Sequence, residues 1–259
     1  MIAPISGAAH VVEYNVAVYR RVWRGSVLVS FISPLFFLAA MGVGLGDLVR
    51  KGSGNVQGVS YLRFLAPGLM AASAMQTALF ETTYPIIGKV YWQRIYDAML
   101  STPLTVRDLH IGEIAWLTVR FIIVATLSFV VMALFGVVTS PLALLAIPAT
   151  VLTGLAFGVP ILAFSATQSN DAGFAPLQRF IVMPLFLLSG PFFPIEQLPG
   201  AFQAIAWVFP LAHGVALTRG VVLSTLGWGA AAMHPAVLLA YIVAGTLAAR
   251  RTLTRRLVV

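Results

Sequence analysis

The chain has 259 residues, of which 59% are hydrophobic and 9% are charged, and its mean hydropathy is +0.94. Soluble domains contain about 45–50% apolar and about 25% charged residues, so this composition excludes a soluble globular domain and indicates a polytopic membrane protein. The net charge of +8 comes from basic residues that flank long apolar runs, which indicates membrane topology rather than nucleic-acid binding. The absence of cysteine excludes a disulfide framework, an iron–sulfur cluster and a thiol nucleophile.

Residues 9–25 form an amphipathic segment when they are wound as a helix. One arc is apolar and carries Val12, Val16, Tyr19 and Trp23. The opposite arc is basic and carries Arg20, Arg21 and Arg24, whereas Asn15 fits neither description. The pattern predicts a helix in the plane of the inner membrane interface. It serves either as a simple anchor or as a contact for a cytoplasmic partner.

Six apolar runs approach or exceed the roughly 20 residues that cross a bilayer. We predict spans at residues 26–46, 64–88, 112–138, 141–167, 180–198 and 233–249. With six spans both termini are cytoplasmic, and basic residues concentrate on the inner side. The outer segments hold Arg50, Lys51, Arg63 and Arg219.

Residues 199–223 are also apolar, but a seventh span would place the C-terminal arginines opposite the basic N-terminus. We therefore expect this segment to enter the membrane from outside and return, as a re-entrant helical pair broken near Pro210. No linker or internal repeat divides the chain, so we expect one domain.

The segment between the second and third spans, residues 89–102, is rich in aromatic and charged side chains. Its first twelve residues can form a short helix, and Pro103 ends the segment. Thr105 followed by Asp108 resembles a capping box that starts the third span. A short helix joined to two spans would act as a lever, and its Trp, Tyr and Arg content suits a protein interface. The alternative is a solvated connector with aromatic residues at the lipid boundary.

Glu81, Glu113 and Arg120 lie inside or at the margins of the second and third spans, where charge is costly and normally paired. Glu113 and Arg120 are seven residues apart and share a helix face. We expect a polar cluster near the inner ends of these helices. It either couples their movement or is purely structural.

The outer end of the fifth span is rich in proline and phenylalanine. Pro191, Pro194, Pro199 and Pro210 interrupt helical hydrogen bonding repeatedly, so we expect a bent, aromatic rim. Phe192 and Phe193 either gate an exit at this rim or pack at the membrane boundary.

Sequence motifs give no support for catalysis by this chain. It contains no GxxxxGK[ST], HExxH or GxSxG motif, and its four histidines have no carboxylate at ligand spacing. We expect neither a metal site nor a bound cofactor. An inverted repeat of the kind many secondary carriers contain is not visible either.

Two runs resemble the permease subunits of type 2 ABC exporters. They are RIYDAMLSTPLT at residues 94–105, and LSGPFFPIEQLP at residues 188–199 followed by Phe209, Pro210 and Leu211. Residues 211–219, LAHGVALTR, resemble the branch that contains permeases for nodulation factors, which are lipo-oligosaccharides, and for anthracycline drugs.

This resemblance implies an all-α integral membrane fold with six transmembrane helices, an N-terminal interfacial helix, a cytoplasmic coupling helix and an extracellular re-entrant helical pair. It implies a plasma (inner) membrane exporter of lipids, glycolipids or hydrophobic drugs. Such an exporter is built from two permeases, with this chain as a homodimer or beside a related one, and two copies of a separate ATP-binding cassette subunit that binds ATP and Mg. The coupling residues carried over are Gln93, Arg94, Tyr96, Asp97, Leu100, Ser101 and Thr102. The alternatives are a secondary carrier and a non-transporting scaffold subunit.

Overall fold

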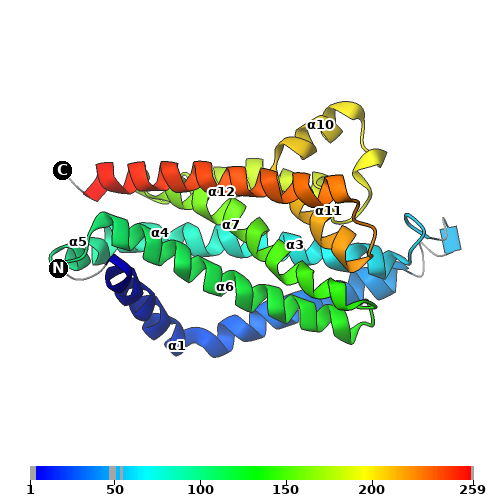
Figure 1. Cartoon of the computed structure of the whole chain (residues 1–259), viewed down its shortest axis with the longest axis horizontal. Helices are drawn as coiled ribbons and strands as arrows, with labels where there is room; N and C mark the ends of the chain where they lie inside the picture. The colour runs from blue at the N-terminus through cyan, green and yellow to red at the C-terminus, as the bar shows by residue number, and fades with distance from the viewer. Residues whose placement is uncertain (1–3, 47–50, 53–54, 258–259) are drawn as a thin grey trace.

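The computed structural model describes residues 4–46, 51–52 and 55–257, and the long helices of this part of the chain run side by side along one axis (Figure 1). Within these ranges the chain forms helices and turns, and its only bridge is an isolated one between Val56 and Val59. The predicted all-α class is therefore confirmed. Arg50, one of the predicted outer basic residues, lies outside the described ranges.

The helices follow one another in this order: α1 (Pro4–Phe37), a π-helical segment (Leu38–Leu45), α3 (Tyr61–Thr82), α4 (Tyr84–Ile87), a second π-helical segment (Gly88–Trp92), α5 (Ile95–Leu100), α6 (Val106–Leu134), a 3-10 turn (Pro141–Leu145), α7 (Ala146–Ser165), α8 (Phe174–Pro176), a third π-helical segment (Leu177–Val182), α9 (Met183–Leu188), a 3-10 turn (Ile195–Gln197), α10 (Gly200–Val208), α11 (Pro210–Val222) and α12 (Trp228–Leu257).

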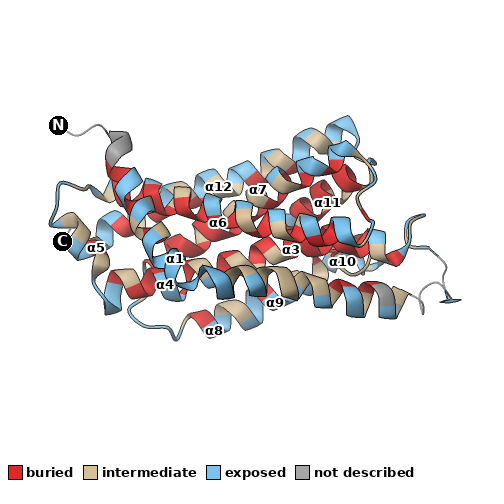
Figure 2. Ribbon diagram, turned by 90° about the horizontal axis from the view of Figure 1, so that it is seen from below, coloured by how far each residue is buried: buried red, intermediate tan, exposed pale blue. Residues whose placement is uncertain are grey.

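The centre of the bundle is α3, which packs against α6, α7 and α11. Figure 2 shows that buried residues gather on these four helices, whereas α9 and α12 carry many exposed ones. Small side chains let the helices approach closely. The ring of Phe121 on α6, for example, lies over Gly154 on α7, where any side chain would collide with it.

Four helices in the described part of the chain are long and apolar enough to cross a membrane. They overlap four of the predicted spans and comprise Gly7–Gly42, Val106–Leu134, Pro141–Ser165 and Trp228–Leu257. The helices at the other two predicted spans are different. Phe174–Leu188 is shorter, and α3 is shielded by its neighbours on most sides, so it needs less apolar surface than a lipid-facing helix. Six crossings stay a prediction.

Several predicted boundaries differ from the structure. Helix α1 continues from Pro4 to Phe37, so the chain has no helix break between the predicted interfacial segment (9–25) and the first span. The predicted span 180–198 ends as a helix at Leu188, because Gly190 adopts φ +84° and prolines follow. The helical pair broken near Pro210 is present, and α10 and α11 meet at a bend of 87°.

Helix α5, the start of α1 and the end of α12 all lie at one end of the bundle (Figure 1). We call this the α5 end. The shared position of the start of α1 and the end of α12 is what an even number of crossings requires. Which side of the membrane this end faces stays a prediction.

Candidate functional site

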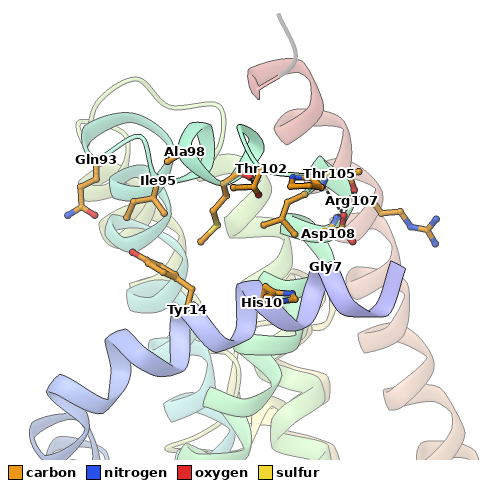
Figure 3. A pocket seen from close by; sticks show the side chains of 13 residues that line it. Gly7, His10, Tyr14, Gln93, Ile95, Ala98, Thr102, Thr105, Arg107 and Asp108 are labelled. Atoms are coloured by element: carbon orange, nitrogen blue, oxygen red, sulfur yellow. Dashed lines mark hydrogen bonds between the residues drawn. The ribbon is translucent and has the colours of Figure 1, made fainter. Parts of the chain in front are cut away.

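A groove at the α5 end separates α5 from the first turns of α1 (Figure 3). Its volume is about 930 Å³. One wall comes from the predicted coupling segment and includes Gln93, Ile95, Ala98 and Thr102, and the other comes from α1 and includes Gly7, His10 and Tyr14. The predicted coupling residues and the predicted interfacial segment therefore form one surface.

The predicted twelve-residue helix at this site is instead two pieces. The π-helical turn Gly88–Trp92 ends at Gln93, and Arg94 then takes a left-handed backbone conformation with φ 49° and ψ 37°. A non-glycine residue adopts this conformation at a cost. The kink at Arg94 redirects the chain, so that α5 begins at Ile95 as a separate helix.

The predicted capping box after α5 is confirmed. The backbone N–H of Asp108 donates to the Thr105 hydroxyl over 3.2 Å, and the backbone N–H of Thr105 donates to the Asp108 carboxylate over 2.9 Å. These bonds satisfy donors at the start of α6. They fix the point at which the α5 segment joins the long helix α6.

The seven predicted coupling residues divide into an exposed set and a buried set. The exposed residues are Gln93, Arg94, Asp97, Ser101 and Thr102. Tyr96 is only 1% exposed, and the half-buried Leu100 packs against the same core cluster. One face of α5 is thus held in the bundle while the other is open to a partner.

Beneath α5, a charged junction joins three segments. The Lys89 ammonium donates to both carboxylate oxygens of Glu113, over 2.7 and 2.9 Å, and to the Asn15 side-chain oxygen over 2.7 Å. Asn15 also donates to Glu113 over 3.3 Å. Burial, and secondly the Glu113 carboxylate, raise the pKa of Tyr96 well above its usual value, so its hydroxyl keeps its proton. We call Asn15, Lys89 and Glu113 the junction.

A second ion pair lies further along the same helices. The Arg120 guanidinium donates to the Glu81 carboxylate over 2.8 Å and to the Ser26 hydroxyl over 2.9 Å. It also lies 4.5 Å from the ring centre of Tyr19.

The three predicted residues therefore lie in two ion pairs, in which Arg120 bonds Glu81 and Lys89 bonds Glu113. No ion pair in the described ranges joins Glu113 to Arg120. Seven residues separate them by about 10 Å along α6, so each finds its partner on a different segment.

A cleft of about 420 Å³ lies beyond this second pair, between α1, α3, α6 and α9. Its polar lining consists of Ser30, Ser33, Ser73, Gln76 and Thr77. Sequence reasoning missed it, although a signal exists: Ser26, Ser30 and Ser33 follow helical spacing on a single face of α1. Polar side chains at this depth are expected to face protein, water or a ligand rather than lipid.

The two predicted rim residues occupy different positions. The ring of Phe192 lies 5.8 Å from the ring of Phe37 and 5.1 Å from that of Phe186, and both of those rings line the cleft. Phe193 is half-buried and shares no such ring contact in the described ranges. Of the two, Phe192 therefore adjoins the cleft, beside Phe37 and Phe186.

Arg219, predicted as an ordinary outer basic residue, holds this rim in place. Its guanidinium donates to the Gly190 carbonyl over 2.7 Å and to the Phe64 carbonyl over 3.1 Å. It also lies 3.7 Å from the ring centre of Phe64. Arg219 thus ties the turn that carries Phe192 to the central helix α3.

The described residues contain no group of three or more His, Asp or Glu side chains that could hold a metal ion. Two histidines near the rim form a hydrogen-bonded pair. The Nδ1 atoms of His213 and His234 lie 2.9 Å apart. His213 also contacts the carbonyl of Trp207 over 2.8 Å. This pair connects α10, α11 and α12.

Comparison with known proteins assigns the chain to a protein family. The family model described as ABC-2 type transporter matches residues 10–223. Nodulation protein J of Rhizobium leguminosarum bv. viciae is 39% identical over 93% of this chain and 94% of its own length, and Nodulation protein J of Rhizobium meliloti is 36% identical over 82% and 79%. The inner membrane transport permease YadH of Escherichia coli is 24% identical over 75% and 74%. No solved structure gives a significant match. The chain therefore belongs to the ABC-2 type transporter family, as a membrane-spanning transport subunit.

Proposed function

We propose that this chain is the permease of an ATP-driven exporter in the inner membrane, and that a separate ATP-binding cassette subunit docks on α5. The observation that carries the proposal is the division of α5 into two faces. Arg94 and Asp97 are exposed beside a groove that a protein segment could fill, while Tyr96 is buried in the bundle. An exposed face rich in charge and backed by a buried aromatic anchor suits a protein interface.

The junction provides a route from α5 to the long helices. Lys89 lies in the π-helical turn just before α5, and its partners Asn15 and Glu113 lie on α1 and α6. A push on α5 would move Tyr96 and Lys89 together, and the buried ion pair would carry that movement to α1 and α6. The ATPase binds ATP and Mg and supplies the energy, and this chain supplies the path.

The cleft and the Phe192 rim form the outward part of that path. An exporter of lipid-like, glycolipid or hydrophobic drug substrates needs a polar route next to lipid, and the cleft offers polar groups beside aromatic ones. In an apolar 18-residue stretch of each candidate span, 11% of the residues of Gly7–Gly42 and 17% of those of Trp228–Leu257 are buried, compared with 44% in Val106–Leu134 and 61% in Pro141–Ser165. These open helix faces leave room for a second permease copy beside this one, as in a homodimer.

The relatives give coarser support. Two are named for nodulation and one is named an inner membrane transport permease. Those names support transport at an inner membrane. A lipid-like, glycolipid or hydrophobic drug substrate is our own proposal beyond those names.

Co-purification tests the proposal. The tagged chain, extracted from its native membrane in mild detergent, should bring down a protein with a phosphate-loop ATPase sequence in near-equal amount. Replacing Arg94 and Asp97 with Ala should lower its recovery at least about tenfold, because hot-spot truncations cost about 2 kcal/mol or more. The matched control K51A/E196A changes one exposed basic and one exposed acidic residue at the opposite end of the bundle and should leave recovery unchanged. A chain that emerges alone would point to a secondary carrier or a scaffold.

A further inference from the structure

The cleft between α1, α3, α6 and α9 has a lining that specifies a class of ligand. It is distinct from the groove at the α5 end, which lies beside the coupling segment. The inference drawn from it rests on the proposed exporter function, because it assigns the substrate class of that path. Its volume of about 420 Å³ falls within the range of small-ligand pockets.

The polar groups of the cleft can both donate and accept hydrogen bonds. Ser73 and Thr77 donate their hydroxyl hydrogens to the backbone carbonyls of Met70 and Ser73. The Ser73 oxygen also lies 3.3 Å from the Ser128 hydroxyl, which leaves one lone pair on Ser73 and two on Thr77 as acceptors. The Gln76 amide has no side-chain partner among the described residues, and neither do the hydroxyls of Ser30 and Ser33. The cleft therefore presents an amide and hydroxyls that are ready to bond a ligand.

The cleft has no charge of its own. None of its twelve lining residues is ionisable at neutral pH. Glu81 and Arg120, which lie close to the lining residues Phe80 and Val124 in sequence, are bonded to one another over 2.7 Å. A charged head group would lose hydration there without meeting a counter-charge, which is strongly unfavourable. A neutral head group would exchange its bonds to water for bonds to Gln76 and the serines.

The remaining lining is apolar and borders the polar groups directly. Phe37, Phe80 and Phe186 contribute aromatic faces, and Phe37 and Phe186 continue into the Phe192 rim. Aromatic faces of this kind pack against the C–H faces of a ring or against an acyl chain. Polar and apolar linings therefore lie side by side, as an amphiphile requires.

We propose that this cleft binds the uncharged, hydroxyl- or amide-bearing head group of an amphiphile, with Gln76 as its central hydrogen-bonding residue. The apolar chain of the ligand leaves along the aromatic lining. Anionic and cationic amphiphiles of the same chain length bind more weakly.

The absence of native cysteine allows a direct binding test. The variant Ser30→Cys places a single, nearly isosteric thiol in the cleft, and Ser33→Cys serves if the first does not express. The full chain, with its co-purifying partners, is held in lipid nanodiscs and labelled with a small maleimide. Three probes with the same dodecyl chain are compared: the maltoside, the phosphate and the trimethylammonium salt.

Dodecyl maltoside should slow labelling of the cleft thiol by the factor 1 + [L]/Kd, where [L] is the free probe concentration and Kd is its dissociation constant. At a probe concentration of nine times Kd this factor is about ten. The two charged probes at equal concentration should slow it less than about twofold. Gln76→Leu should abolish the protection by maltoside, and Gln76→Glu should make the cationic probe the best protector. Ser169→Cys, in an exposed loop, controls for effects on the reagent and should label equally under all conditions.

Two results would overturn the assignment in different ways. Equal protection by a charged probe would refute the substrate class and leave the path intact. No protection by any probe, or a thiol that is unreactive before probes are added, would show that the cleft is not the path. Neither result bears on the ATPase docking at α5, which co-purification measures separately.

Discussion

The buried carboxylate of Glu113, near the α5 end, takes its partners from other segments of the chain. Glu113, which is 2% exposed, accepts hydrogen bonds from the Lys89 ammonium and the Asn15 amide. Such a group is stable only while all its partners keep their positions, because an unpaired buried charge is costly. The junction is therefore sensitive to the relative placement of α1, the turn before α5, and α6.

Removing one junction charge should destabilise the protein. In Glu113→Gln the Lys89 ammonium loses its carboxylate, which costs about 3 kcal/mol because the pair is buried. Thermal unfolding in nanodiscs should show a clear fall in Tm. Adding Lys89→Met to the same variant should restore part of the loss, since no unpaired charge then remains. Asp171→Asn changes an exposed carboxylate and should leave Tm within error. An unchanged Tm for Glu113→Gln would contradict the account of the junction.

Sequence reasoning could identify Glu81, Glu113 and Arg120, because charge within an apolar run stands out. It could not find their partners. Asn15 lies 98 residues from Glu113, and it did not fit the apolar arc of the N-terminal segment. In the structure it faces α6 together with Val11, whereas Trp23 of the predicted apolar arc is exposed. Periodicity could not separate these faces, since a lipid-facing side and a protein-facing side are both apolar.

At the scale of elements, α5 depends on a backbone conformation that the sequence did not signal. Periodicity predicts one helix through residues 89–100, but the left-handed turn at Arg94 divides it. Glycine is the residue that signals such a conformation, and arginine is not. The capping box at Thr105 and Asp108 and the break before Pro210 were predictable, because they depend on local chemistry alone.

The conformation of Arg94 allows its roles in folding and coupling to be separated. Arg94→Gly should preserve Tm or raise it slightly, since glycine relieves a left-handed strain of about 1 kcal/mol. It should nevertheless weaken recovery of the ATPase, because the exposed guanidinium is lost. Arg94→Val should lower Tm, because a β-branched residue is disfavoured at φ 49°. A stable Arg94→Gly protein that retains full ATPase recovery would exclude Arg94 from the docking surface.

At the scale of the whole molecule, hydropathy identifies the helices that face lipid and misses the one that does not. Most residues of helix α3 are buried, and it carries the polar side chains Ser73, Gln76 and Thr77. It is therefore less apolar than the four helices that are long and apolar enough to cross a membrane. The positions of α1, α5 and α12 at one end agree with an even number of crossings (Figure 1). That this end is cytoplasmic stays a prediction from charge bias.

The most direct test of the account uses single cysteines at the two ends of the bundle. Ser101→Cys lies on the exposed side of α5, and Ser140→Cys lies in the loop between α6 and α7 at the opposite end. Each variant, in native membranes, is treated with a membrane-permeant thiol-to-amine cross-linker. Ser101→Cys should yield an adduct of this chain with a phosphate-loop ATPase, and Ser140→Cys should not. Absence of the ATPase adduct from Ser101→Cys, or equal adducts from both positions, would contradict the claim that α5 couples this permease to an ATPase.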